Sequence, residues 1–71
     1  MEKDIGKIKL TENTSIVVRL DEYEEKQGVT IRKYVESERY TGFTKQGVRI
    51  PIDHWKEFKR LVDEVDKELQ G

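Results

Sequence analysis

Apolar and polar side chains alternate along four short segments in the first fifty residues. The segments cover residues 5–10, 16–23, 29–35 and 43–50, and glycines or the polar cluster at 12–14 separate them. Period-two alternation is typical of antiparallel strands that bury one face and expose the other. We therefore predict four such strands, with a hairpin turn at 24–28 that has Gly28 near its end and a further connection at 36–42.

After Pro51 the apolar period lengthens from two residues to between three and four, which indicates a helix over about residues 52–69. Pro51 suits the helix entry, where its missing N–H is harmless, and Asp53 suits the positive end of the helix dipole. Because the strands precede the helix without alternating with it, the fold class is α+β, a single ββββα domain over residues 1–71 with residues 1–4 frayed. The apolar stripe of the helix consists of Trp55, Phe58, Leu61, Val62, Val65 and Leu69.

One helix can cover only one face of a four-stranded sheet, so we expect the opposite face to be exposed. Aromatic side chains on such a face can stack on bases, which contributes roughly 1–3 kcal/mol per base, and cations can meet phosphates. A solvated sheet face has a similar composition, and it remains the alternative. The residues that the alternation places there are Lys7 or Lys9, Arg19, Thr30, Arg32, Tyr34 and Arg49.

The net charge of −1 does not by itself suggest an anionic partner, but its distribution is uneven. Residues 21–38 and 51–71 are acidic, whereas residues 39–50 contain three basic residues and no acidic one. That cationic segment also holds Tyr40 and Phe43. Arg39 and Phe43 are therefore added to the candidate nucleic-acid contacts.

A chain of 71 residues with 34% hydrophobic and 41% charged residues has little material for a core. There is no cysteine and only one histidine, His54, which excludes disulfides and the usual zinc sites. A second subunit is the remaining means of stabilisation, and the helix stripe exceeds what one small sheet needs, so we expect a homodimer. We expect no enzyme activity, cofactor, metal or membrane segment, and a cytoplasmic location.

Three stretches together carry a family resemblance: residues 31–34 (Ile-Arg-Lys-Tyr), residues 42–51 (Gly-Phe-Thr-Lys-Gln-Gly-Val-Arg-Ile-Pro), and Trp55 in the first helical turn. In this order and spacing they resemble the transcriptional positive cofactor four family, in a compact form that looks like its prokaryotic or phage members. The similarity covers most of residues 5–69. It implies a curved four-stranded antiparallel sheet with one helix, a homodimer, and binding of single-stranded or melted DNA with little sequence preference; RNA is an alternative ligand. In a prokaryote, a nucleoid association would follow.

The resemblance also assigns roles to individual residues. Lys7 matches a basic position on the first strand, Tyr23 a stacking aromatic, Arg32 a phosphate-binding arginine and Lys45 one of a basic pair. Gln46 stands at the other position of that pair, and Val35 at the position of a stacking tryptophan in some members, for which Tyr40 or Phe43 would substitute. A homodimeric module that binds a protein of the transcription machinery, and not nucleic acid, is the alternative function. The candidate nucleic-acid contacts are Lys7, Arg19, Tyr23, Arg32, Tyr34, Arg39, Phe43 and Lys45.

Overall fold

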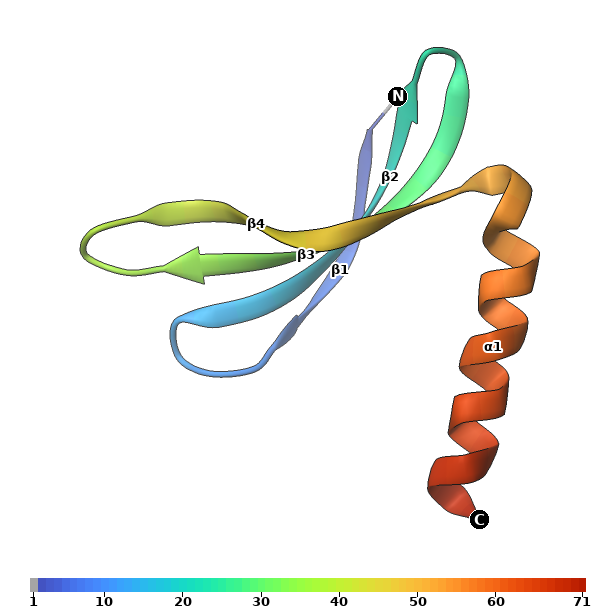
Figure 1. The fold of residues 1–71 in the computed structure, drawn as a ribbon. Helices are drawn as coiled ribbons and strands as arrows, with labels where there is room; N and C mark the ends of the chain where they lie inside the picture. The colour runs from blue at the N-terminus through green and yellow to red at the C-terminus, as the bar shows by residue number, and fades with distance from the viewer. Residues whose placement is uncertain (1) are drawn as a thin grey trace.

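The computed structural model describes residues 2–71, which form a four-stranded antiparallel sheet followed by one helix (Figure 1). The strands follow one another in the sheet in chain order, each paired with the next. This confirms the predicted α+β class. The elements are β1 (Lys3–Lys9), β2 (Thr14–Tyr23), β3 (Lys26–Glu36), β4 (Thr41–Pro51) and α1 (Ile52–Gln70).

Two local predictions were wrong, both because the strands are longer than the apolar alternation. Lys3 and Asp4 belong to β1, where they pair with Leu20 and Arg19, although we expected residues 1–4 to be frayed; Met1 lies outside the described residues. The β2–β3 hairpin turn is tighter than predicted, because Tyr23 already pairs with Lys26 and only two residues connect the strands. Gly28 is consequently a strand residue and not part of the turn.

The register gathers the apolar residues of the sheet on one face, because directly opposed residues on antiparallel strands point to the same side. Leu20, Val29 and Ile50 form one cross-strand row. A second row and the paired isoleucines of β1 and β2 complete what we call the apolar face. Its members are Ile8, Ile16, Val18, Leu20, Val29, Ile31, Val48 and Ile50.

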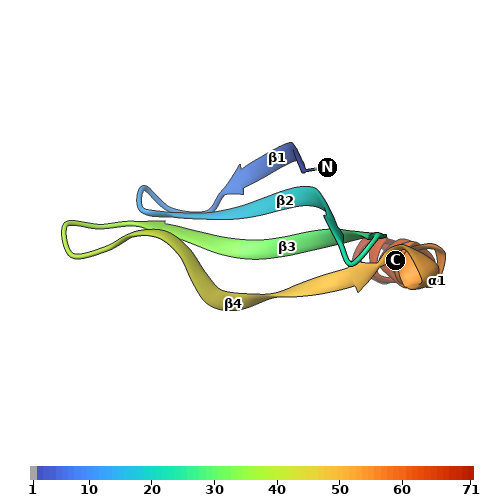
Figure 2. The same ribbon diagram turned by 90° about the horizontal axis from the view of Figure 1, so that it is seen from above.

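The helix begins beside this face but does not extend across it, contrary to the expectation that it would cover one side of the sheet. Among the described residues, α1 contacts only β3 and β4, and it then runs away from the sheet (Figures 1 and 2). Pro51 is the N-cap, with extended backbone angles, and Asp53 of the first turn accepts a hydrogen bond from Lys26 Nζ at 3.2 Å. The junction is therefore fixed at the hairpin end of the sheet, while the later turns of the helix are free of it.

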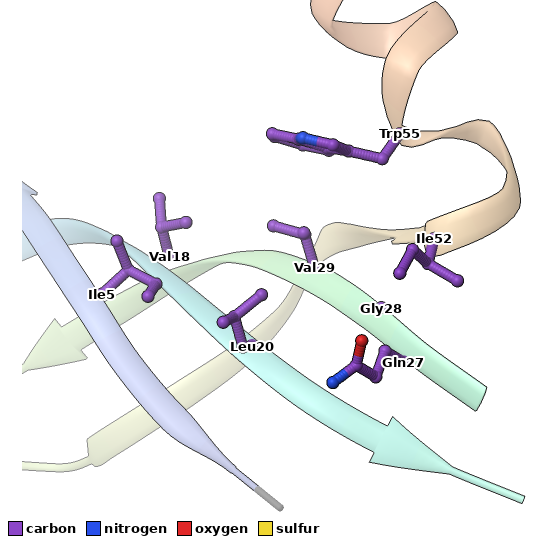
Figure 3. Close-up of a pocket in the computed structure, with 8 residues that line it drawn as sticks. All are labelled: Ile5, Val18, Leu20, Gln27, Gly28, Val29, Ile52 and Trp55. Atoms are coloured by element: carbon purple, nitrogen blue, oxygen red, sulfur yellow. The ribbon is translucent and has the colours of Figure 1, made fainter. Parts of the chain in front are cut away.

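Trp55 is the helix side chain that projects over the apolar face. Its side chain extends from the first turn of α1 over Val29, and Val18, Leu20 and Ile5 lie on the sheet nearby (Figure 3). An apolar cavity of about 230 Å³ remains between them. The centroids of the Trp55 and Phe58 rings lie 5.7 Å apart. Trp55 and Ile52 are thus the residues of α1 that line this cavity over the sheet.

A single chain buries very little. Among the described residues Val29 is the one buried hydrophobic side chain, and no residue of α1 is buried. The later members of the helix stripe are strongly exposed, from 47% for Val62 to 80% for Leu69. The predicted stripe therefore exists, but it forms no core within one chain.

Candidate nucleic-acid interface

The second side of the sheet carries the charged and aromatic residues that the alternation predicted. Asp4, Arg19, Thr30 and Arg49 lie opposite one another across all four strands, which makes a continuous polar row with three charged members. Beside it runs the row of Lys7, Val17, Arg32 and Gly47, and further along Tyr34 is paired with Phe43. We call this side the polar face; its side chains are Asp4, Lys7, Lys9, Ser15, Val17, Arg19, Asp21, Thr30, Arg32, Tyr34, Phe43 and Arg49.

An aromatic and cationic cluster occupies the middle of the polar face. The rings of Tyr34 and Phe43 meet edge to face with their centroids 5.2 Å apart. The guanidinium carbon of Arg19 lies 5.8 Å from the centroid of the Phe43 ring, within the range of a cation–π contact. Phe43 nevertheless remains 38% exposed, so part of its ring is open to a ligand.

Two open depressions adjoin this cluster, and Arg19 and Phe43 line both of them. The first, of about 480 Å³, extends over Lys7, Val17 and Tyr34 toward β1. The second, of about 460 Å³, lies toward β4. Both are shallow and wide, a shape that suits an extended chain better than a small enclosed molecule. The second is lined by Arg19, Thr30, Arg32, Tyr40, Phe43, Thr44 and Lys45.

A bulge in β4 positions Lys45 at the edge of the second depression. Arg32 pairs with Gly47 and Tyr34 with Phe43, so three residues of β4 stand opposite Lys33 alone. Figure 2 shows β4 bending away from the plane of its neighbours. Thr44 holds the bulge: its hydroxyl donates to Lys33 O at 3.1 Å, and its carbonyl accepts from Arg32 Nη1 at 3.1 Å. Bulges often re-aim side chains next to functional sites.

At the hairpin end of the polar face Arg49 is held in a structural network. Its Nε donates to Asp21 Oδ1 at 2.8 Å, and its Nη2 donates to Lys26 O at 3.1 Å. Thr30 donates its hydroxyl proton to the other oxygen of Asp21. The Thr30 hydrogen bond, followed by the Arg49 partner, lowers the pKa of Asp21 below its ordinary value. Arg49 is therefore committed to the fold and has little charge to offer a ligand.

Arg19 is also paired, but more loosely. Its Nε lies 2.6 Å from Asp4 Oδ1 and its Nη2 lies 3.5 Å from Glu2 Oε2. Both carboxylates are well exposed, and the arginine side chain is 31% exposed. Surface pairs of this kind contribute little to stability.

Three other cations line the two depressions, and none of them has an acidic partner within ion-pair distance among the described residues. Within residues 2–71, no carboxylate lies within 4.0 Å of the side-chain nitrogens of Lys7, Arg32 or Lys45. Arg32 makes only the neutral hydrogen bond to Thr44 described above. These three side chains carry the uncompensated positive charge at the two depressions.

Six of the eight residues nominated from the sequence thus line one or both depressions: Lys7, Arg19, Arg32, Tyr34, Phe43 and Lys45. Tyr23 lies apart, 66% exposed at the end of β2, where it lines a separate hollow with Lys26 and His54. Arg39 lies in the turn after β3 and lines neither depression.

The sequence reasoning missed the acidic partners and the bulge. Asp4 had been placed in a frayed terminus, and its pairing with Arg19 follows only from the strand register. Asp21 sits on the same face as Arg19, two residues away, and that spacing could have indicated an acid among the cations. Nothing in the sequence indicated that Thr44 holds a bulge, because a bulge shifts the strand register without requiring particular residue types.

The described part of the chain holds no group of three or more histidine, cysteine, aspartate or glutamate side chains placed to bind a metal ion. Its single helix is too polar to cross a membrane. Comparison with protein-family models, with curated proteins and with solved structures finds no match to this chain.

Proposed function

We propose that this chain binds single-stranded nucleic acid on the polar face, with phosphates at Lys7, Arg32 and Lys45 and bases against Phe43 and Tyr34. The observation that carries the proposal is the convergence of uncompensated cations and a partly open aromatic ring on one shallow, grooved surface. A single strand fits such a surface because its bases are free to stack and its backbone can follow the cations. Single-stranded or melted DNA is the proposed ligand, with RNA as the alternative.

Fluorescence anisotropy with a labelled oligothymidine tests this proposal. We expect the single strand to bind more tightly than a duplex of the same length, and affinity to fall with salt at a log–log slope of about −0.7 per phosphate contact. Lys45→Ala should weaken binding without lowering the thermal stability. Arg32→Ala should weaken binding too, with a loss of only about 1 kcal/mol of stability from its hydrogen bond to Thr44 O. Lys56→Ala, on the exposed surface of α1 away from the polar face, serves as the matched control. Absence of binding at low salt would leave a protein-binding module, such as a partner of the transcription machinery, as the better proposal.

We also propose that the functional unit is a homodimer. The chain exposes 6254 Å², whereas a folded monomer of 8.4 kDa is expected to expose about 4,600 Å². Its radius of gyration is 14.0 Å against about 11 Å expected for its length. The surplus of roughly 1,600 Å² exceeds the roughly 800 Å² that each partner buries in a standard interface.

The apolar face and the helix stripe are the surfaces that a second copy would cover, because both are apolar and both are exposed in a single chain. Such a dimer leaves both polar faces free for the nucleic acid. Sedimentation equilibrium at micromolar concentration should return twice the 8.4 kDa mass of one chain. A monomer mass there would refute the dimer and leave the binding proposal to be judged by anisotropy.

A further inference from the structure

Arg19 occupies the centre of the polar face, where it lines both depressions and contacts the Phe43 ring. It is the best-placed cation for a phosphate that passes between them. In the free protein, however, its charge is countered by two carboxylates from the beginning of the chain, Asp4 at 2.6 Å and Glu2 at 3.5 Å.

The contact between Arg19 and Asp4 is close but poorly directed. Asp4 Oδ1 does not lie along the N–H direction of Arg19 Nε, and this buried nitrogen has no hydrogen-bond acceptor among the described residues. The carboxylates themselves are 73% and 65% exposed, so water competes for both. An exposed pair of this kind can be displaced by an anion that offers better-placed oxygens.

The second arginine of the same cross-strand row makes the contrast clear. Arg49 makes a directed hydrogen bond to Asp21, whose side chain is only 19% exposed and also accepts from Thr30. Removing Asp21 would disturb the fold, whereas removing the acids beside Arg19 would mainly uncover a charge. The two ion pairs have the same composition but different roles.

Resting on the proposed function, we propose that Glu2 and Asp4 restrain nucleic-acid binding by holding Arg19 as internal counterions that a backbone phosphate must displace. This restraint lowers the affinity for nucleic acid. It also reduces the net release of salt ions on binding, because the displaced carboxylates take up cations when the phosphate arrives. Arg19 then acts as a reserve contact that is engaged only when a strand spans both depressions.

The test is a double substitution, Glu2→Gln/Asp4→Asn, measured by anisotropy with labelled oligothymidine over a range of salt concentrations. We expect binding about threefold to fivefold tighter than wild type and a log–log salt slope steeper by about 0.7. The matched control is Glu12→Gln/Glu64→Gln, which removes the same charge from exposed positions away from the polar face. In an Arg19→Ala background the Glu2 and Asp4 substitutions should give no gain beyond that of the control.

The outcomes separate the two proposals. Binding by the wild type with no greater gain in the Glu2/Asp4 variant than in the control overturns the restraint and leaves the proposed function intact. A gain that persists in the Arg19→Ala background also overturns it, because general repulsion would then be the cause. No binding by any variant at low salt overturns the proposed function itself, and binding only by the Glu2/Asp4 variant supports both.

Discussion

Gly47 is required where it stands because β3 passes too close for a side chain. A Cβ there would lie 2.8 Å from Ile31 O and 3.1 Å from Arg32 Cα, both backbone atoms that can move only with the strand. We expect Gly47→Ala to lower the free energy of unfolding by about 1–3 kcal/mol, the usual cost of overpacking.

Chemical denaturation measures this change. Gly6→Ala is the matched control, since a Cβ at Gly6 meets nothing within 4 Å and should be neutral or stabilising by about 0.4–1 kcal/mol through the unfolded chain. Equal effects of the two substitutions would contradict the steric explanation. Gly47, which belongs to the stretch 42–51 that carries the family resemblance, is thus explained by the close approach of β3 and β4 beside the bulge.

Asp21 makes the stability of the chain depend on acid. Its pKa in the folded state is lowered from 3.8, first by the Thr30 hydroxyl and then by Arg49. Between the two pKa values the unfolded chain binds more protons, so the Asp21 contribution is complete above about pH 4 and is lost as the pH falls through the folded value. We expect Asp21→Asn to lower stability at pH 7 by about 2 kcal/mol, with the difference from wild type shrinking below pH 4.

Thermal unfolding of both proteins between pH 7 and pH 2 measures this effect. Asp63→Asn, on the exposed part of α1, should unfold in parallel with the wild type. A difference between wild type and Asp21→Asn that stayed constant down to pH 2 would show that the carboxylate is not the titrating group.

At the scale of the elements, the β2–β3 hairpin turn has an unfavourable sequence for its backbone. Glu24 and Glu25 are its two connecting residues, with φ angles of 51° and 66°. Two-residue hairpins with positive φ at both positions favour Asn-Gly, and a non-glycine residue in this region costs on the order of 1 kcal/mol. Glu24→Asn/Glu25→Gly should therefore raise the free energy of unfolding by about 1 kcal/mol.

Denaturant titration of this variant beside Glu24→Gln/Glu25→Gln checks the cause. The second variant removes the same two charges but still places non-glycine residues at the two positions with positive φ. If both were stabilised equally, repulsion between the two carboxylates would be the reason, and not the left-handed backbone.

The sequence predicted the elements well and their packing less well. Period-two alternation located four strands and the two faces, because burial of one face dictates which residues share it; Val18 and Ile31 are on the apolar face as expected. The position of α1 could not be predicted. An apolar stripe indicates that Leu61 and Val65 are buried against another surface, but it does not show which surface that is. The β4 bulge and the pairing of Asp4 with Arg19 depend on register, which residue types alone leave open.

At the scale of the whole molecule, the chain is a slab of 39 × 38 × 18 Å with its largest apolar surfaces exposed. If a second copy covers them, folding and association are linked, so the melting temperature should rise with protein concentration. Val65→Glu/Leu69→Glu should lower the melting temperature and abolish this dependence. Calorimetry over a hundredfold range of concentration measures it. Lys59→Glu is the control, because it reverses one charge outside the stripe and so makes the same change of −2 in net charge. A melting temperature independent of concentration in the wild type would argue against the dimer.

The arginines of neighbouring rows on the polar face also affect how the strands find their partners. In the native register Arg49 stands opposite Thr30, beside Asp21. A slip of two residues that keeps both faces intact would set Arg49 directly opposite Arg32, and like charges in that position oppose pairing. Hydrophobic alternation forbids slips of one residue, and the arginines discourage this slip of two. Arg49, which Asp21 holds in the fold, and Arg32, a proposed phosphate contact, therefore help together to keep the growing sheet from mispairing.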